Sequence, residues 1–128
     1  MDRKLKARLE PVIKMAKEDK EIIAVILFGS AARGEKYRDV DVALVVDSRM
    51  SALLMSKKRL KYLSAFPDID VQIFNKLPIY IRKRVLEDGK VLLFNDYDKA
   101  YDIAIDTIRE FDDFRPYYED YLEATMNA

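Results

Sequence analysis

Residues 22–46, with the sequence IIAVILFGSAARGEKYRDVDVALVV, decide the fold of this chain. Ile22 to Phe28 is an almost unbroken apolar run rich in β-branched residues, which at this length predicts a buried strand. Gly29-Ser30 ends that run and predicts a turn. Val40 to Val46 is a second run of the same kind, so the stretch predicts two buried strands joined by a polar connection.

Hydrophobic spacing predicts helices on both sides of these strands. Asp2 caps an expected first helix whose apolar face contains Leu5, Leu9, Val12, Ile13 and Ala16, and Pro11 either kinks this helix or starts its second part. After the second strand we expect a helix over 51–64, with a cap at Ser48 or Ser51 and apolar residues at Leu53, Leu54, Leu60 and Leu63. A strand over 69–74 and a helix over 79–87 follow, and this helix ends at a left-handed Gly89. The last elements are a strand over 91–94 and two helices, over 98–112 and 116–124. This order predicts an α/β (α+β) fold, in which helices flank one sheet.

The composition limits the classes of function. A chain of 128 residues suits a single domain over 1–128, with a core at about 22–94 and a helical tail at about 98–124. The absence of Cys and His excludes disulfides, thiolate zinc sites and imidazole catalysis, so any chemistry depends on carboxylates, hydroxyls and cations. Lys plus Arg equals Asp plus Glu at 23 each, which disfavours a nucleic-acid partner. We read no membrane span and no secretory signal, and we expect a cytoplasmic protein.

Asp39 and Asp41 are the first candidates for chemistry. Three Asp-x-Asp pairs occur, at 39/41, 68/70 and 96/98, and only the first opens a strongly apolar strand. Because side chains alternate along a strand, both carboxylates point the same way and repel each other. A divalent cation would compensate this charge, and oxygen ligands favour Mg²⁺, with Mn²⁺ as the alternative. The competing interpretation is that both side chains simply project into water.

Gly29 and Ser30 are candidates for a phosphate site. A strand that runs into Gly-Ser-Ala-Ala-Arg-Gly can present backbone N–H groups and a hydroxyl at the start of a helix, where phosphate binds well. Arg33 adds a cation nearby. The alternative is an ordinary turn from strand to helix with a serine cap.

The segment 28–35, FGSAARGE, followed by 39–46, DVDVALVV, resembles the signature of the DNA polymerase beta nucleotidyltransferase superfamily, most closely its minimal nucleotidyltransferases of the antitoxin type. The resemblance covers about 22–94 and implies the nucleotidyltransferase fold, a mixed four-stranded sheet flanked by helices, with C-terminal helices. It implies that Gly29 and Ser30 hold the triphosphate, with Arg33 nearby. Eight residues separate Ser30 from Asp39, fewer than the minimal members usually have.

The resemblance also implies the catalytic groups. Asp39, Asp41 and Asp70 form the catalytic set and bind two Mg²⁺ ions, and Asp68 is the alternative third carboxylate. The implied reaction is two-metal transfer of a nucleoside monophosphate from ATP or another NTP to a hydroxyl.

The acceptor implied by the resemblance is a small helical HEPN-domain toxin, which the transferase neutralises by attaching AMP to a tyrosine. Two alternatives stay open: an antitoxin that binds without turnover, and a transferase acting on a small molecule or RNA. A homo-oligomer is also open. The tail aromatics either form an interface or pack, with Ile105 and Ile108, onto the sheet; they are Tyr97, Tyr101, Phe111, Phe114, Tyr117, Tyr118 and Tyr121.

Overall fold

The helices and strands follow the expected order along the chain. The structure is a computed structural model that describes residues 2–126. Both ends of the expected domain therefore lie outside the described residues, and the bounds 1–128 stay a prediction. The elements are α1 (Arg3–Lys17), β1 (Ile22–Phe28), α2 (Gly29–Ala32), β2 (Val40–Val46), α3 (Ala52–Ala65), β3 (Ile69–Ile73), the 3₁₀ helix η1 (Phe74–Lys76), α4 (Ile79–Asp88), β4 (Lys90–Phe94) and α5 (Tyr97–Met126).

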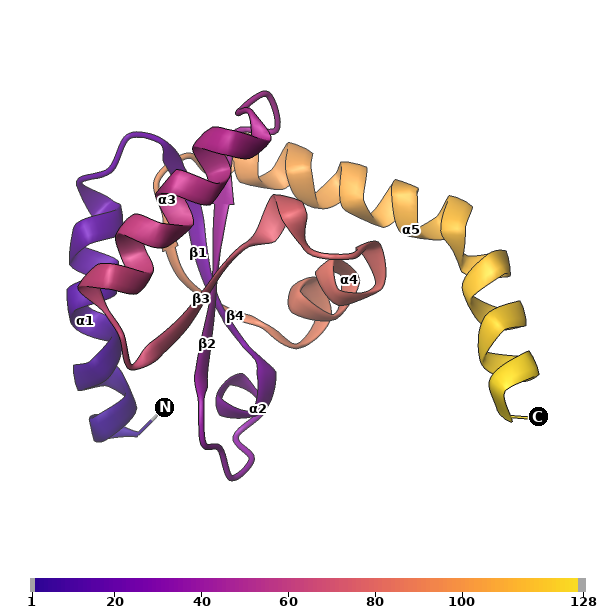
Figure 1. Ribbon diagram of the computed structural model, residues 1–128, viewed down its shortest axis with the longest axis horizontal. Coiled ribbons are helices and arrows are strands. Elements are labelled where there is room, and N and C mark those ends of the chain that lie inside the picture. The colour runs from indigo at the N-terminus through magenta and orange to yellow at the C-terminus, as the bar shows by residue number, and fades with distance from the viewer. Residues whose placement is uncertain (1, 127–128) are drawn as a thin grey trace.

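The four strands form one mixed sheet in the order β3-β2-β1-β4, with helices on both faces (Figure 1). β1 is antiparallel to β2 and to β4, whereas β2 and β3 run parallel. The expected fold class is confirmed. In the register of the sheet, Asp41 lies opposite Phe28 on one side and Asp70 on the other. The end of β1 and the beginnings of β2 and β3 therefore meet at one end of the sheet.

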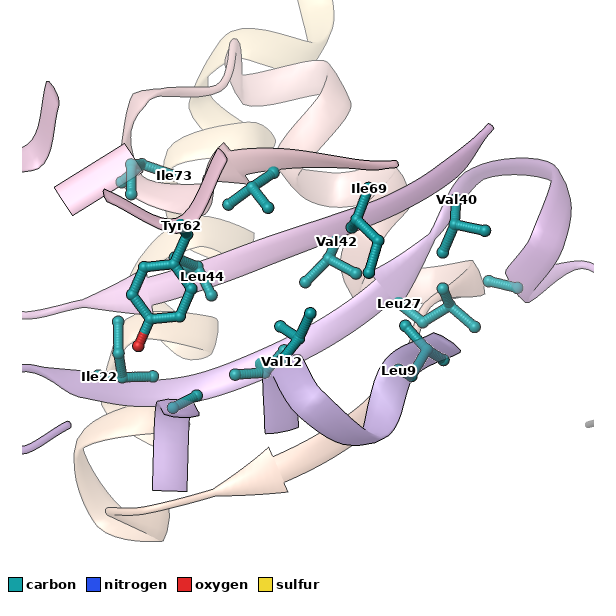
Figure 2. Close-up of a cluster of buried hydrophobic side chains, with 14 of the residues drawn as sticks. Leu9, Val12, Ile22, Leu27, Val40, Val42, Leu44, Tyr62, Ile69 and Ile73 are labelled. Atoms are coloured by element: carbon teal, nitrogen blue, oxygen red, sulfur yellow. The ribbon is translucent and has the colours of Figure 1, made fainter. Parts of the chain in front are cut away.

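The first hydrophobic core lies between the sheet and the helices α1 and α3 (Figure 2). Asp2 caps α1 by accepting a hydrogen bond of 2.8 Å from the backbone N–H of Leu5, as expected. Leu9 and Val12 of α1 are fully buried. From β2, alternate residues face this core, namely Val40, Val42, Leu44 and Val46.

The second core lies on the opposite face, beneath α4 and α5. Ala43 and Val45 of β2 face this side together with Phe74 and Val85. Phe74 does not end the third strand as expected but begins η1, and its ring is buried. Because side chains alternate along β2, Asp41 shares this second face with Ala43. The face of the sheet that α4 covers therefore carries the charged start of β2.

The buried face of α3 differs from the expected one. Leu53, Leu54 and Leu60 are exposed, whereas Met55, Lys58 and Tyr62 are buried. The physical reason is a polar network that ties α3 to the segment before β1. Lys58 Nζ donates to Asp19 at 2.9 Å and to Glu21 at 2.8 Å, and the Tyr62 hydroxyl donates to Asp19 at 2.9 Å.

We expect Lys58→Met to lower the free energy of unfolding by about 2–3 kcal/mol, because it leaves the nearly buried Asp19 carboxylate without its cation while the aliphatic packing is kept. Chemical denaturation measures this loss. Lys14→Met, at an exposed position of α1, is the matched control and should change stability by less than about 0.5 kcal/mol. Equal stability of the two variants would contradict a stabilising network.

Gly89 ends α4, but not in the left-handed conformation that the sequence predicted. Its φ is −69°, which any residue adopts. A Cβ atom at this position would lie 2.3 Å from the carbonyl oxygen of Val85 and 2.6 Å from Cγ2 of Ile26. Glycine is needed here because α4 and β1 approach each other closely, and not because of backbone conformation.

Neither internal proline divides its helix. Pro11 lies within the continuous helix α1, and Pro116 lies within α5, where two separate helices were expected. Proline lacks the N–H that would bind the carbonyl of Asp112, and α5 changes direction in its C-terminal half (Figure 1). Although α5 has 30 residues, no helix within residues 2–126 is both long and apolar enough to cross a bilayer.

The two interpretations of the tail aromatics divide along α5. Its first half packs on the second core through Ala100 and Ile103, and Phe111 is buried. Ile105 is partly buried and Ile108 is exposed. Beyond residue 111 no described side chain is fully buried, and Tyr117 and Tyr121 are exposed. Packing on the sheet thus accounts for the first half only.

Candidate active site

Asp41 and Asp70 are brought side by side by the parallel pairing of β2 with β3. The charge of Asp70 is close enough to act on Asp41 and to raise its pKa. Gln72, two residues further along β3, donates from Nε2 to Asp70 Oδ1 at 3.0 Å. Asp41 is partly buried and Asp70 is exposed. The pair therefore opens to solvent at the end of the sheet.

Asp39 and Asp68 flank this pair. Asp39 is exposed, precedes β2, and is close enough for its charge to act on Asp41. Asp68 precedes β3, and its backbone carbonyl accepts a hydrogen bond of 2.9 Å from Arg8 Nη2. The carboxylates that act on Asp41 are Asp70 and Asp39. This geometry favours Asp70 over Asp68 as the third carboxylate, and the catalytic roles stay predictions.

Gly29 joins β1 to α2 in direct contact with Asp41. Its φ is +73°, in the left-handed region that favours glycine. A Cβ atom on Gly29 would lie 2.4 Å from Asp41 Oδ2. Ser30 follows in the first turn of α2 and is partly exposed, and the first N–H groups of a helix have no partner within it. The predicted phosphate turn and the predicted metal ligands therefore lie together.

Arg33 lies at the end of α2, where its guanidinium is engaged by a neighbouring carboxylate. Its Nη2 is 3.2 Å from Glu35 Oε1, and the side chain is partly exposed. The hydrogen bond that Arg33 donates to Glu35 raises the pKa of Arg33, and the charge of Asp41 acts in the same direction. A phosphate that binds Arg33 has to compete with Glu35 for this side chain.

The surroundings of Asp41 raise its pKa to about 6. The largest cause is burial on the sheet face, and the negative charges of Asp70 and Asp39 add to it. An ionised Asp41 is therefore unfavourable without a cation. A raised pKa in a group of like charges is typical of functional sites.

This raised pKa predicts a pH dependence of stability. An unfolded aspartate has a pKa of about 3.9, so ionisation of Asp41 destabilises the fold increasingly as the pH rises from about 4 to about 6. Asp41→Asn cannot ionise. We expect it to match the unmodified protein at about pH 4 and to exceed it by about 1 kcal/mol at pH 7, because solvent screens this partly exposed group.

Urea unfolding at a series of pH values in the presence of a chelator measures this difference. Asp47→Asn is the control of opposite sign, because hydrogen bonds from Arg49 lower the pKa of Asp47 to about 2. The stabilisation by Asp47 is present above the unfolded pKa and is lost as the pH falls towards 2. A difference for Asp41→Asn that does not grow with pH would contradict the raised pKa.

The donor set fits a hard divalent cation. Asp39, Asp41 and Asp70 supply only carboxylate oxygens, which suit Mg²⁺ and Mn²⁺. Within residues 2–126 these carboxylates have no basic ion-pair partner. In the same residues, no group of three or more potential ligands is placed so that it could hold a metal ion. The raised pKa of Asp41 is the observation that fits a cation here, because a cation would relieve the repulsion.

An apolar cavity of about 190 Å³ lies away from these carboxylates. Residues of the sheet, α4 and the first half of α5 line it, with Ile26, Phe74 and Tyr101 among them. None of the predicted site residues lines it. The candidate site is therefore the open end of the sheet.

Two polar partners of the site were not predicted from the sequence. Gln72 binds Asp70, and Glu35 binds Arg33. Gln72 follows Asp70 by two residues on one strand, so the two side chains share a face, and this spacing was a usable signal. Glu35 lies in a loop, and periodicity gives no direction for its side chain.

Comparison with known proteins gives a family and a relative. The family model described as "Polymerase beta, Nucleotidyltransferase" matches residues 10–98. A protein of Methanocaldococcus jannaschii named "Putative protein adenylyltransferase MJ1547" is 30% identical over 81 residues, which are 61% of this chain and 61% of that protein. The match thus spans less than two thirds of the relative's length.

Solved structures share the fold at low sequence identity. A chain of a toxin-antitoxin crystal structure with AMP-PNP is 18% identical, with a TM-score of 0.69 over 94% of this chain and 98% of that chain. A chain from the complex of tri-AMPylated Shewanella oneidensis HEPN toxin with MNT antitoxin is 18% identical, with a TM-score of 0.67 over the same shares. Since the family model covers most of the chain, this protein belongs to the polymerase beta nucleotidyltransferase family.

Proposed function

We propose that this chain is a Mg²⁺-dependent nucleotidyltransferase that transfers AMP from ATP to a hydroxyl of a partner protein. The observation that carries the proposal is the contact of the Gly29 turn with Asp41, which itself lies beside Asp70. Membership of the family and the name of the M. jannaschii relative support it. ATP is favoured over other nucleotides because a solved structure of the same fold is described with AMP-PNP.

The chain's own residues perform three tasks in this reaction. Gly29 and Ser30 hold the β- and γ-phosphates through backbone N–H groups and the serine hydroxyl, with Arg33 as a further cation. Asp39, Asp41 and Asp70 would hold Mg²⁺, which would neutralise charge on the attacking and leaving oxygens. The exposed Asp70 can also accept the proton of the attacking hydroxyl and return it to water.

The bonds of the transfer balance without any further reactant. The acceptor oxygen forms a bond to the α-phosphorus of ATP, the bond between this phosphorus and the bridging β-phosphate oxygen breaks, and pyrophosphate leaves. The products are the AMP-modified acceptor and pyrophosphate. This single displacement needs no histidine and no covalent enzyme intermediate.

The acceptor in this proposal is a tyrosine of a HEPN-type toxin, and the chain acts as its antitoxin. The support is the similarity of fold to a chain from a complex described as containing an AMPylated HEPN toxin and an MNT antitoxin.

Labelled ATP tests the proposal directly. The protein is incubated with [α-³²P]ATP, Mg²⁺ and a HEPN-domain protein from the same organism, and the labelled proteins are separated by gel electrophoresis. Label on the HEPN protein, lost on substitution of its tyrosine acceptor, is the expected result. Asp98→Asn is the matched control variant, because Asp98 belongs to another Asp-x-Asp pair and is exposed on α5.

The remaining outcomes decide between the alternatives. Tight binding of the HEPN protein without label would overturn the enzymatic proposal and leave a binding antitoxin. Label on a small molecule or on RNA, with none on protein, would replace the acceptor class but keep the transferase chemistry.

A further inference from the structure

The C-terminal turns of α5 carry an exposed stripe of aromatic and acidic residues. In Figure 1 this part of the helix extends away from the sheet, and Tyr118 stacks on Tyr80 of α4 with 5.6 Å between the ring centroids. Tyr117 and Tyr121 are 73% and 66% exposed. Asp113 and Asp120 lie on the same face, because the four residues follow the spacing i, i+4, i+7, i+8. Aromatic side chains are enriched at protein interfaces, so an exposed pair of them indicates a possible contact surface.

The outer face of α3 carries the complementary pattern at the same spacing. Leu53 and Leu60 are 65% and 61% exposed. Lys57 and Lys61 lie beside them and are exposed as well. Here the order is apolar, basic, apolar, basic, whereas on α5 it is acidic, aromatic, acidic, aromatic. Neither the two lysines nor the two aspartates have an ion-pair partner within residues 2–126.

Basic and acidic residues are also distributed unevenly along the whole sequence. Residues 1–90 contain 20 basic and 13 acidic residues, whereas residues 91–128 contain three basic and ten acidic residues. The net charges are therefore +7 and −7. Two copies of such a chain attract each other when the acidic end of one meets the basic part of the other.

The two faces cannot meet within one chain. Met55 and Tyr62 pack α3 against the first core, whereas Ala100 and Ile103 pack α5 against the second core, on the opposite face of the sheet. Figure 1 places α3 and the end of α5 on opposite sides of the molecule. A contact between the two faces therefore requires two molecules.

We propose that this protein forms a homodimer in which the C-terminal turns of α5 of each copy dock on the outer face of α3 of the other copy. Tyr117 and Tyr121 pack against Leu53 and Leu60, while Asp113 and Asp120 approach the lysines. A two-fold axis makes the two contacts identical, so the contact between α5 of one copy and α3 of the other occurs twice in the dimer. This proposal does not depend on nucleotidyl transfer.

Sedimentation velocity at 50 mM and 500 mM NaCl tests the dimer. The unmodified protein should sediment as a dimer at low salt, with a dissociation constant at least about tenfold higher at high salt. Two charge-reversed variants, Lys57→Glu/Lys61→Glu and Asp113→Lys/Asp120→Lys, should each be monomeric. All four positions are exposed, so both variants should keep the circular dichroism of the unmodified protein.

Mixing the two variants gives the most specific result. The reversed α3 of the first variant faces the reversed α5 of the second, and the unmodified helices face each other, so both contacts are restored and a heterodimer is expected. Lys6→Glu/Lys14→Glu makes the same change of charge on α1 and should leave the dimer intact.

Three results would overturn the proposal: a monomeric unmodified protein, a dimer that survives both reversals, or reversed variants that do not recombine. A monomer whose α5 reversal abolishes binding of the HEPN protein would assign the stripe to that partner.

Discussion

Asp41→Asn is expected to reduce transfer of AMP by a factor on the order of 10³ or more, which corresponds to about 4 kcal/mol of transition-state stabilisation. Asparagine keeps the shape of the side chain but removes the charge that lies between Gly29 and Asp70. The proposed cation would lose its central ligand, while the phosphate turn would remain. Single-turnover transfer from labelled ATP measures the effect.

The stability of this variant makes its activity easy to interpret. Removal of the charge ends its burial and its repulsion from Asp70 and Asp39, so the variant should be about 1 kcal/mol more stable than the unmodified protein at pH 7. A loss of activity in a protein that is no less stable cannot come from misfolding. Asp98→Asn should keep full activity. If Asp41→Asn retained more than about a tenth of the activity, Asp41 would not be the central ligand.

Gly29→Ala is expected to reduce transfer by a factor on the order of 10² to 10³, because two independent effects act at this position. The first is the φ of +73°, which costs an alanine about 1 kcal/mol. The second is the position of the new Cβ atom, 2.4 Å from Asp41 Oδ2. Either the turn or the carboxylate has to move, and both belong to the proposed site.

Gly34→Ala separates the two effects. Gly34 has a φ of +72°, almost the same as that of Gly29, but a Cβ atom there would meet no other atom within 4 Å. The two variants should therefore lose similar stability from the backbone, whereas only Gly29→Ala should lose most of the transfer activity. Equal activities would show that contact between Gly29 and Asp41 is irrelevant to the reaction. Chemical denaturation and single-turnover transfer measure both quantities.

The elements that the sequence predicted well are those with a strong local signal. β1 and β2 are apolar runs bounded by glycine or charged residues, and the structure places them at the expected bounds. Asp2 caps α1, and Ser51 caps α3 by accepting a hydrogen bond of 3.2 Å from the N–H of Leu54. Local geometry alone determines such features, because the partners are close in sequence.

The predictions that were wrong concern packing between distant segments. The buried face of α3 depends on Asp19, which binds Lys58 and Tyr62. These residues lie 39 and 43 positions further along the sequence. Hydrophobic periodicity predicted that the leucines form the buried face, because it takes no account of a buried ion pair. Likewise, Gly89 is required by an approach of α4 to β1 that no local pattern encodes.

The sequence by itself determined the strands, the Gly-Ser turn, the candidate carboxylates and the resemblance to a nucleotidyltransferase, because these depend on residue type and spacing along the chain. Only the tertiary structure decided that Asp70 lies beside Asp41, that Gly29 touches Asp41, and that Arg33 is held by Glu35. The physical reason is the parallel register of β2 and β3 and the sharp turn after β1. These place Asp41 in a partly buried position beside other carboxylates. The raised pKa of Asp41, which comes first from burial and then from the charges of Asp70 and Asp39, therefore exists only in the folded chain.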